Sequence, residues 1–410
     1  MEQFARLDLL ACLKCIREKL GSPKNMKIGL VHDPYSPISL GNVGGEDNLV
    51  ELEVTQLEAR GHEVQRIMRI LDGGRRRFIH GIVTASGRGI SPIDKKSIDS
   101  LDLIHTNNLS LVSGYSWIDK SRVPVVSSFH NYRPLCPISI SWRDGNLCFE
   151  CRDVSSFKAV QHRCGGVVGL LGSIRKGVLQ RNEPEIQKPS HLIFTSNKMA
   201  AAYQATTKIS NFDILHNPSR FKTTNNSSKT LSLSATPPKG FLFAGRLTPE
   251  KGVIELIEKW PEQEPLTIAG SGVLESKVRK LCDSRQNIKF YGTFSPHDHN
   301  FYGQFEALIF PSSWLEGSPL VVIEAISMGV PVIATDTSSA TELIEQSQCG
   351  ITIPQNYSTE QIRIAISRLR KNSNIFRRNG LVAGETIFSP DTWIKNLESI
   401  FERVLRNKVL

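Results

Sequence analysis

A binding site is predicted where two glutamates lie eight positions apart, in the segment Phe310 to Thr335, FPSSWLEGSPLVVIEAISMGVPVIAT. Glu316 precedes a predicted helix and Glu324 lies inside it. A carboxylate in so apolar a helix needs hydrogen-bond donors, and the adjacent hydroxyls of a sugar are donors of the right kind. The free N–H groups at the start of the helix suit a phosphate. Together these features predict a site for a nucleotide sugar.

The helix that positions this site is predicted to run from Leu320 to Met328. Ser318 is of the type favoured as an N-cap, and Pro319 suits the first helical position. Gly329 is expected to end the helix. The residues expected to bind the donor here are Gly317, Ser318, Pro319, Leu320, Val321 and Glu324.

Other segments with chemistry-bearing residues occur in order along the chain: Gly44 to Glu46 (GGE), Ser128 to Asn131 (SFHN), Leu215 to Pro218 (LHNP), Phe243 to Gly252 (FAGRLTPEKG) and Ile268 to Gly272 (IAGSG). With the Glu-x7-Glu segment they resemble the signature of the retaining glycosyltransferases of family 4. The resemblance begins at about Met26 and reaches the C-terminus. It implies the α/β GT-B fold, in which two doubly wound Rossmann-like domains face a deep cleft.

The length of 410 residues and a hydrophobic share of 40% are sufficient for two such domains. We expect a helical extension at 1–25, an acceptor-side domain at 26–218, a nucleotide-sugar-binding domain at 219–388, and a helix at 389–410 that crosses back to the first domain. A cysteine-containing insertion is expected at 132–165. Residues 222–238 are rich in Ser, Thr and Asn and are predicted to be a flexible connection.

Short apolar runs predict the parallel strands of both domains. They lie at 26–32, 101–106, 124–130, 191–195, 241–244 and 266–269, and helices are predicted at 46–60 and 390–404. Ligands should bind at the carboxyl ends of these strands, between the two domains.

Two cations follow the predicted strand at 241–244. Arg246 comes directly after Gly245, and Lys251 follows in the same loop. Fixed cations in a cleft stabilise the charge that develops on a departing diphosphate, and the resemblance assigns Arg246 and Lys251 this role. It also implies that Glu316 orients the transferred sugar and that Glu324 holds the ribose. The donor is further expected to approach Gly245, Ser271 and Gly272.

The sequence contains no Asp-x-Asp, the carboxylate pair that commonly carries a divalent metal to a diphosphate. We therefore expect no cofactor in catalysis. The resemblance implies front-face attack, with the departing phosphate helping to deprotonate the acceptor.

On the acceptor side, Gly44 and Gly45 would let the backbone approach a ligand at the start of the helix at 46–60. His130 follows a predicted strand and matches a histidine of the family that contacts donor sugar or acceptor. The resemblance makes it a candidate catalytic residue.

Four cysteines lie within the insertion as C-x11-C-x2-C-x12-C: Cys136, Cys148, Cys151 and Cys164. They meet the ligand count of a structural zinc site, although the outer spacings are long. The sequence leaves open whether they bind zinc or stay as reduced thiols. The eight cysteines of the chain are too few for a disulfide scaffold.

The net charge of +10 is uneven, since residues 1–218 hold 28 Lys and Arg against 21 Asp and Glu. A basic N-terminal domain would suit contact with an anionic membrane surface or a phosphorylated acceptor, or it is simply a solvated face. The N-terminus does not have the pattern of a secretory signal. We expect a cytoplasmic protein, at the inner face of the membrane if the basic face binds lipid, and no nucleic-acid partner.

Together with the resemblance, these observations predict a hexosyltransferase that moves a sugar from a nucleoside diphosphate to a glycan or lipid-linked glycan in surface polysaccharide synthesis. The resemblance implies that the transfer retains the configuration. Two alternatives stay open. A GT-B sugar-nucleotide epimerase would need no acceptor, and a silent glycan- or nucleotide-binding protein would have lost catalysis.

Overall fold

The computed structural model describes residues 25–32, 45–67, 95–107, 117–118, 121–155, 157–164, 186, 188–206, 208–221, 239–294 and 299–409. The predicted N-terminal helix, Gly44 and the predicted connection at 222–238 lie outside these residues.

The N-terminal part of the described chain forms a six-stranded parallel sheet in the order β2-β1-β3-β4-β7-β8. Its strands are β1 (Lys27–His32), β2 (Glu63–Ile67), β3 (Leu103–Asn107), β4 (Val125–Phe129), β7 (His191–Phe194) and β8 (Phe212–Ile214). The helices described in this part are α2 (Gly45–Ala59), α4 (Lys95–Asp99) and α9 (Asn197–Gln204).

The C-terminal part forms a second six-stranded parallel sheet, in the order β11-β10-β9-β12-β13-β14. Its strands are β9 (Phe241–Ala244), β10 (Leu266–Ala269), β11 (Ile288–Gly292), β12 (Ala307–Phe310), β13 (Val332–Thr335) and β14 (Gly350–Ile353). The helices are α11 (Val253–Lys259), α12 (Glu275–Asp283), α13 (His299–Gly303), α14 (Leu320–Ser327), α15 (Ala340–Ser347), α16 (Thr359–Lys371) and α17 (Ser373–Thr386).

The second sheet has the strand order of a doubly wound nucleotide-binding fold, in which the order reverses between β9 and β12. Ligands of such sheets bind beyond the carboxyl ends of the strands at this reversal. The loops that follow β9 and β12 border this binding position, and they carry the predicted cations and Glu316.

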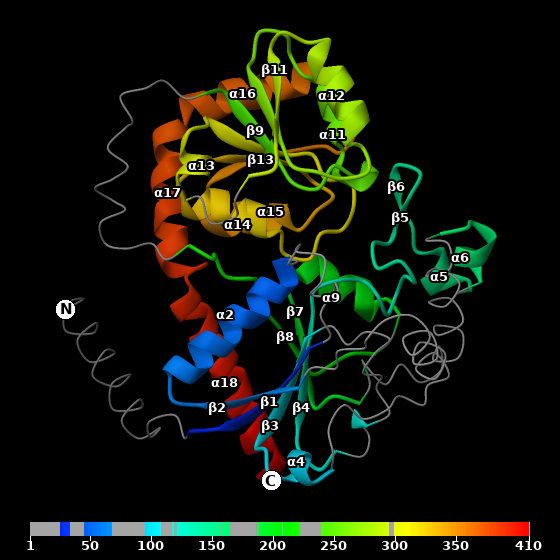
Figure 1. Cartoon of the computed structure of the whole chain (residues 1–410), viewed down its shortest axis with the longest axis vertical. Coiled ribbons are helices and arrows are strands. Elements are labelled where there is room, and N and C mark those ends of the chain that lie inside the picture. Colours follow the sequence, from blue (N-terminus) through cyan, green and yellow to red (C-terminus); the bar gives the residue numbers. More distant parts are fainter. Residues whose placement is uncertain are drawn as a thin grey trace, which may run out of the picture.

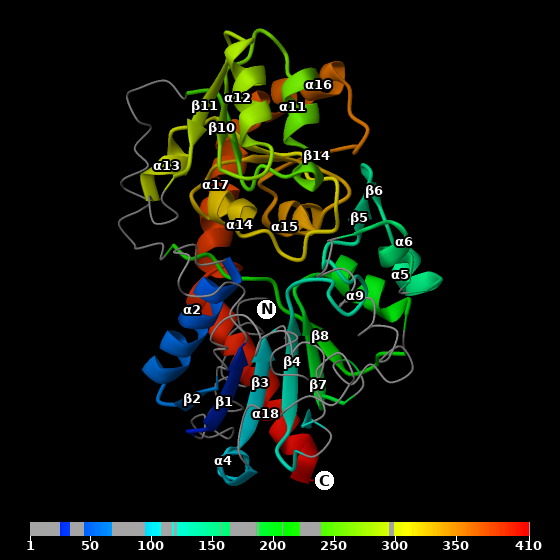
Figure 2. The same cartoon turned by 45° about the vertical axis from the view of Figure 1, so that its right-hand side comes forward.

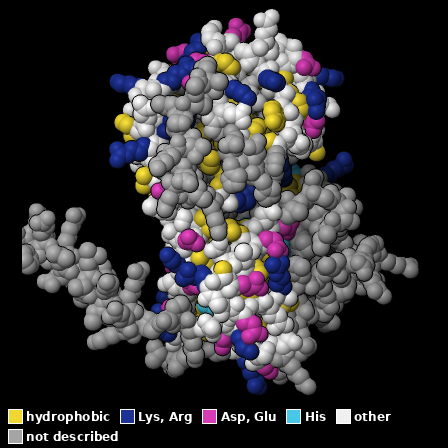
Figure 3. Space-filling view, turned by 60° about the vertical axis from the view of Figure 1, so that its left-hand side comes forward, with side chains coloured by type: hydrophobic (Ala, Val, Ile, Leu, Met, Phe, Trp, Pro, Cys, Tyr) yellow, Lys and Arg dark blue, Asp and Glu magenta, His cyan; other side chains and the backbone are white. Residues whose placement is uncertain are grey.

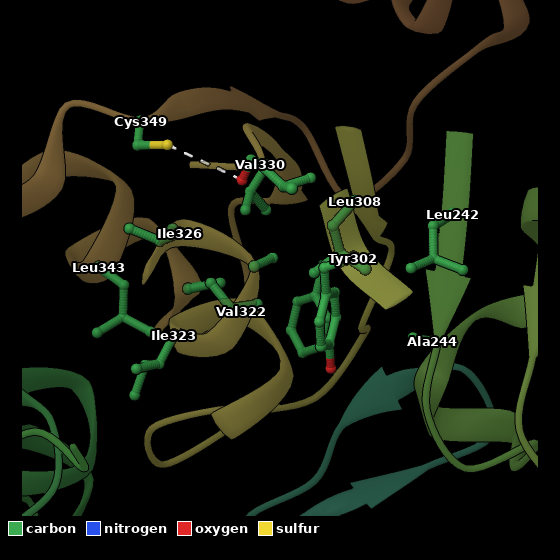
Figure 4. Close-up of a cluster of buried hydrophobic side chains, with 14 of the residues drawn as sticks. Leu242, Ala244, Tyr302, Leu308, Val322, Ile323, Ile326, Val330, Leu343 and Cys349 are labelled. Atoms are coloured by element: carbon green, nitrogen blue, oxygen red, sulfur yellow. Dashed lines mark hydrogen bonds between the residues drawn. The ribbon is translucent and has the colours of Figure 1, made fainter. Parts of the chain in front are cut away.

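Apolar side chains cover both faces of the central strands, which is why their sequences are continuous apolar runs. Every residue of β9, β12 and β13 is buried. In one of the two main clusters of the C-terminal domain, Leu242 and Leu308 from the sheet belong to the same buried group as Val322 and Ile326 from α14 (Figure 4). The predicted parallel α/β architecture is confirmed, with strand ends displaced by at most two residues. The strands at 241–244 and 266–269 are reproduced in full.

The last helix, α18 (Pro390–Val409), follows α17 and runs from the C-terminal lobe down to the N-terminal one (Figures 1 and 2). It is longer than the predicted 390–404. Its buried side chains, among them Ile394 and Phe401, pack with Ile28 of β1, Leu103 of β3 and Val126 of β4. The C-terminal segment thus belongs to the core of the N-terminal domain.

A small unit projects from the N-terminal lobe after β4 and lies beside the C-terminal lobe (Figures 1 and 2). It contains the antiparallel pair β5 (Trp142–Arg143) and β6 (Asn146–Leu147), followed by α5 (Glu150–Asp153) and α6 (Lys158–Gln161). This unit contains the four cysteines of the predicted insertion.

In the described residues no helix is both long and apolar enough to cross a membrane. On the face drawn in Figure 3, basic and acidic side chains are interspersed over both lobes.

Candidate active site

Lys251 and Glu316 form an ion pair between the loops that follow β9 and β12. Glu316 is only 6% exposed. Its Oε1 also accepts hydrogen bonds from Ser312 Oγ (2.9 Å) and Trp314 Nε1 (2.7 Å). A buried carboxylate with three donors has a fixed position and is compensated for its lost hydration. The structure thus brings together two residues that the sequence places 65 positions apart.

The two loops can lie so close because Gly252 follows Lys251 with a φ of +69°. A Cβ at this position would lie 2.2 Å from the carbonyl oxygen of Pro311. Glycine is needed both for the positive φ and for this approach.

Arg246 has a different environment, with a side chain that is 59% exposed. Its Nη2 lies 3.6 Å from Oε1 of Glu250, and that carboxylate also accepts a 2.6 Å hydrogen bond from Thr248. Such a long, exposed ion pair holds a guanidinium weakly. Arg246 can therefore turn toward a ligand at little energetic cost.

The glycines of the Ile268 to Gly272 motif are required by contacts between loops. A Cβ on Gly270 would lie 1.8 Å from the carbonyl oxygen of Gly245, and one on Gly272 would lie 2.6 Å from that of Leu247. The backbone N–H of Leu247 also donates to the carbonyl of Ser271 over 2.8 Å. Packing alone thus accounts for these glycines, and the contact of Ser271 and Gly272 with a donor stays a prediction.

Ser318 does not cap α14, contrary to the expectation from its residue type. The N-cap is Pro319, and no side chain caps the helix. Ser318 Oγ instead accepts a 3.0 Å hydrogen bond from the backbone N–H of Asn217, and its carbonyl accepts a 2.9 Å bond from Asn217 Nδ2. The Leu215 to Pro218 motif therefore fixes the loop before α14 from the N-terminal domain, and this bond competes with capping.

Glu324 is 1% exposed, and each of its carboxylate oxygens is engaged. Oε1 accepts from Arg220 Nε at 2.5 Å, and Oε2 accepts from the hydroxyl of Tyr302 at 2.9 Å. Burial raises the pKa of Tyr302 well above its usual range, so it stays a donor. Sequence reasoning did not identify Arg220 or Tyr302, because no motif marks them. A ribose at Glu324 would have to share or replace these partners.

His130 lies beyond the end of β4 and is connected to a buried polar chain. Its Nε2 is 2.9 Å from Oδ1 of Asn107 at the end of β3, and Nδ2 of Asn107 is 3.0 Å from Oε2 of Glu53 in α2. The other oxygen of Glu53 lies 2.5 Å from Nδ1 of His105. Glu53, His105 and Asn107 are each 1% exposed. Sequence reasoning missed Glu53 and Asn107, since a single polar residue in a helix or at a strand end is not distinctive.

The direction of these hydrogen bonds sets the tautomer of His130. A carboxylate only accepts, so the NH₂ group of Asn107 faces Glu53 and its carbonyl oxygen faces His130. Nε2 of His130 therefore carries a proton and donates it. Burial, followed by the neighbouring His105 and His32, lowers the pKa of His130 from 6.5 to about 3. The imidazole is thus neutral at neutral pH.

Gly317 connects the two halves of the site. A Cβ on Gly317 would lie 2.7 Å from Thr195 Oγ1 and 3.1 Å from the carbonyl oxygen of His130, both in the N-terminal domain. Glu316, which precedes Gly317, and His130 therefore lie on chain segments that are in direct contact. A second link joins the domains where Glu342 accepts from the backbone N–H groups of Asn197 and Lys198, each over 2.8 Å.

The remaining predicted positions are partly described. Gly45 opens α2, while Gly44 lies outside the described residues, so their contact with an acceptor stays a prediction. Leu320 and Val321 form the first turn of α14 and are half-buried. The four cysteines, Cys136, Cys148, Cys151 and Cys164, line one small cavity. In the described part of the chain, however, no three or more His, Cys, Asp or Glu side chains already form a metal site.

Residues 227–380, which hold the loops after β9 and β12, match the family model Glycosyl transferases group 1. The matched segment covers less than half of the chain. The matched segment contains Arg246, Lys251, Glu316 and Glu324, while His130 and Glu53 lie outside it.

Among curated relatives, the chain is 29% identical over 187 residues to an exopolysaccharide phosphotransferase of Streptomyces coelicolor, covering 43% of this chain and 20% of the relative. It is 25% identical over 186 residues to the lipopolysaccharide 1,2-N-acetylglucosaminetransferase of Salmonella typhimurium, covering 40% of this chain and 48% of the relative. The chain thus spans at most about half the length of either relative.

Among solved structures, the chain resembles HepE of Anabaena in complex with UDP-glucose, with a TM-score of 0.60 and 16% identity. The match covers 92% of this chain and 100% of that one. At this identity the likeness shows the fold alone. It confirms the predicted GT-B fold of two Rossmann-like domains.

Proposed function

We propose that this protein is a glycosyltransferase that moves a hexosyl group from a nucleoside diphosphate sugar to a hydroxyl of a glycan or lipid-linked glycan, with retention of configuration. The observation that carries the proposal is the Lys251–Glu316 pair, which lies where the second sheet reverses its order and on a segment in contact with that of His130. The match of residues 227–380 to the group 1 model and the structural likeness to HepE, which was solved with UDP-glucose, support a nucleotide-sugar donor.

In the proposed reaction the bond between the sugar C1 and the β-phosphate oxygen breaks, and its electron pair stays on the diphosphate. The acceptor hydroxyl oxygen forms the new bond to C1 on the face that the phosphate leaves. Its proton passes to the departing phosphate oxygen. Atoms and charges balance, and no base from the protein is required.

Arg246 and Lys251 would stabilise the charge on the departing diphosphate. The two cations are suited to complementary tasks. Lys251 is fixed by its buried partner Glu316, whereas Arg246 is exposed and weakly held, so it can close onto the donor after binding. The N–H groups at the start of α14 would add to this anion site.

Glu316 and His130 would orient the hydroxyls of the transferred sugar. Glu316 accepts three hydrogen bonds at Oε1, and a carboxylate has further lone pairs at Oε2 for a sugar hydroxyl. Because His130 is neutral, it adds no positive charge beside C1, where cationic character develops during transfer. Glu324 would hold the ribose.

The proposal is tested by incubating the full chain with a panel of nucleotide sugars, with and without bacterial glycan acceptors. A new glycoside whose anomeric proton coupling matches that of the donor supports retaining transfer. Conversion of the nucleotide sugar into its epimer without an acceptor would instead indicate an epimerase. Nucleotide binding without turnover of any donor would indicate a binding protein.

A further inference from the structure

The unit that follows β4 contains very little apolar interior. Its helices α5 and α6 have four residues each, and its strands β5 and β6 have two. Val154 and Phe157 are each 64% exposed, and Leu147 and Val160 are also exposed. Trp142 and Phe149 pack against the apolar cluster of the N-terminal domain, but α5 and α6 bury only Cys151 and Ala159. Such short helices bury too little apolar surface to offset their ordering entropy, so we expect a further interaction to stabilise them.

The cysteines of this unit come from four separate places and converge. Cys136 follows a turn at Tyr132, Cys148 follows β6, Cys151 lies in α5, and Cys164 follows α6. All four line one cavity of about 20 Å³, which is room for a single water-sized species. None of the four forms a disulfide bond.

The polar side chains around this cavity are engaged with one another. Arg143 Nη2 donates to Glu150 Oε1 at 2.7 Å, and His162 Nε2 lies 2.9 Å from Glu150 Oε2. His162 and Glu150 are paired with each other, and the four sulfurs are the soft metal ligands among the lining side chains. Arg143 and Lys158 also line it and would offset the negative charge of thiolates.

We propose that Cys136, Cys148, Cys151 and Cys164 bind one structural Zn²⁺ ion as thiolates. Four sulfur ligands make a closed tetrahedral site, and four protons leave to solvent when the ion binds. The described residues contain no group of three or more His, Cys, Asp or Glu side chains that is already placed to hold a metal ion. Binding must therefore draw the sulfurs inward across the cavity. The free energy of metal binding then stabilises a unit that has little apolar interior of its own.

The ion would also fix a contact between this unit and the C-terminal domain. The β5–β6 hairpin lies between Cys136 and Cys148, and Trp142 in it donates from Nε1 to Ser313 Oγ at 2.9 Å. Ser313 belongs to the loop that carries Glu316. The zinc site is therefore positioned to hold the hairpin against this loop.

The test is elemental analysis of the full chain, purified under reducing, chelator-free conditions. We expect about one zinc per chain, and its loss in Cys148→Ser and Cys151→Ser. Cys282→Ser, which changes a buried cysteine of α12, serves as the control and should keep the metal. Replacement by Co²⁺ should give thiolate-to-cobalt absorption that the first two variants lack. A zinc content well below one per chain, or a zinc content that neither substitution lowers, would overturn the proposed site.

A second measurement applies if the serine variants do not fold. The unaltered protein is titrated with an organomercurial reagent while a chelating dye reports released zinc. Release in step with modification of four thiols supports the site, whereas modification of these thiols without release overturns it. Neither readout depends on sugar transfer, so the zinc site and the proposed function can fail independently.

Discussion

Glu53 and His130 are joined through the single amide group of Asn107, although they come from α2 and the end of β4. The carboxylate orients the amide, and the amide fixes the proton of His130 on Nε2. Glu53 is thereby a positioning residue for a candidate catalytic histidine.

Replacing Glu53 with Gln should disturb this arrangement, because a glutamine amide can donate to Asn107 and let its side chain turn over. We expect turnover to fall by on the order of tenfold or more. The nitrogen chemical shifts of His130 should show a changed tautomer, which a purely structural role would not produce. Glu51→Gln is the matched control, since Glu51 lies on the same helix and is exposed. An unchanged His130 spectrum would contradict the assignment.

The pH dependence of stability should report His130, whose pKa falls from 6.5 to about 3 on folding. As the pH decreases below about 6.5, the unfolded chain takes up a proton here that the folded chain does not, so the free energy of unfolding decreases. Urea denaturation at about pH 7.5 and pH 5 should show a decrease larger by up to about 2 kcal/mol in the wild type than in His130→Gln. Equal decreases in the two proteins would rule this out.

Arg246→Ala should lower kcat/KM by about a hundredfold or more, because it removes a charge opposite the departing diphosphate. Its stability should change by less than about 0.5 kcal/mol, since the side chain is exposed and its ion pair is long. Arg363→Ala, at a similarly exposed arginine paired with Glu360, is the control. Lys251→Ala is less informative, because it also leaves Glu316 buried without its cation. Near-normal turnover of Arg246→Ala would remove this residue from the site.

Glu324→Gln should weaken binding of a nucleoside diphosphate by about tenfold if the carboxylate holds the ribose. It should also lower stability, because Arg220 loses its counter-ion. Tyr302→Phe removes only the hydrogen bond to Oε2, so it should lower stability and leave nucleotide affinity close to that of the wild type. Calorimetry that finds unaltered affinity in Glu324→Gln would leave Glu324 a purely structural residue.

Sugar transfer should persist in excess EDTA, because no Asp-x-Asp is present to carry a divalent ion to the diphosphate. The zinc content should be measured in the same samples, so that slow loss of the thiolate-bound ion is not mistaken for an effect on catalysis. Loss of activity with full zinc retention, restored by Mg²⁺ or Mn²⁺, would refute metal-free transfer.

The parallel strands could be predicted because burial on both faces leaves a continuous apolar run, as in Phe241–Ala244. The order of motifs along the chain then indicated which strand ends carry the site. Ser318 could not be assigned from its type, because its partner Asn217 is 101 positions away and competes with the helix N–H groups.

The partners of the site residues were beyond sequence reasoning for the same reason. Arg220 reaches Glu324 over 104 positions, and Glu53 reaches Asn107 over 54. Neither pair has a spacing that periodicity or a local motif would reveal. Only the folded arrangement of helices around the two sheets selects them.

The path of α18 sets an order of events during synthesis. Ile28, Leu103 and Val126 precede the second sheet along the chain, yet the side chains that cover them, such as Ile394 and Phe401, follow it and are translated only after that sheet. The N-terminal domain is thus completed only after the second sheet has been synthesised. A chain interrupted before Pro390 would leave that apolar surface exposed. Such exposure favours chaperone binding or aggregation over a soluble, partly folded protein.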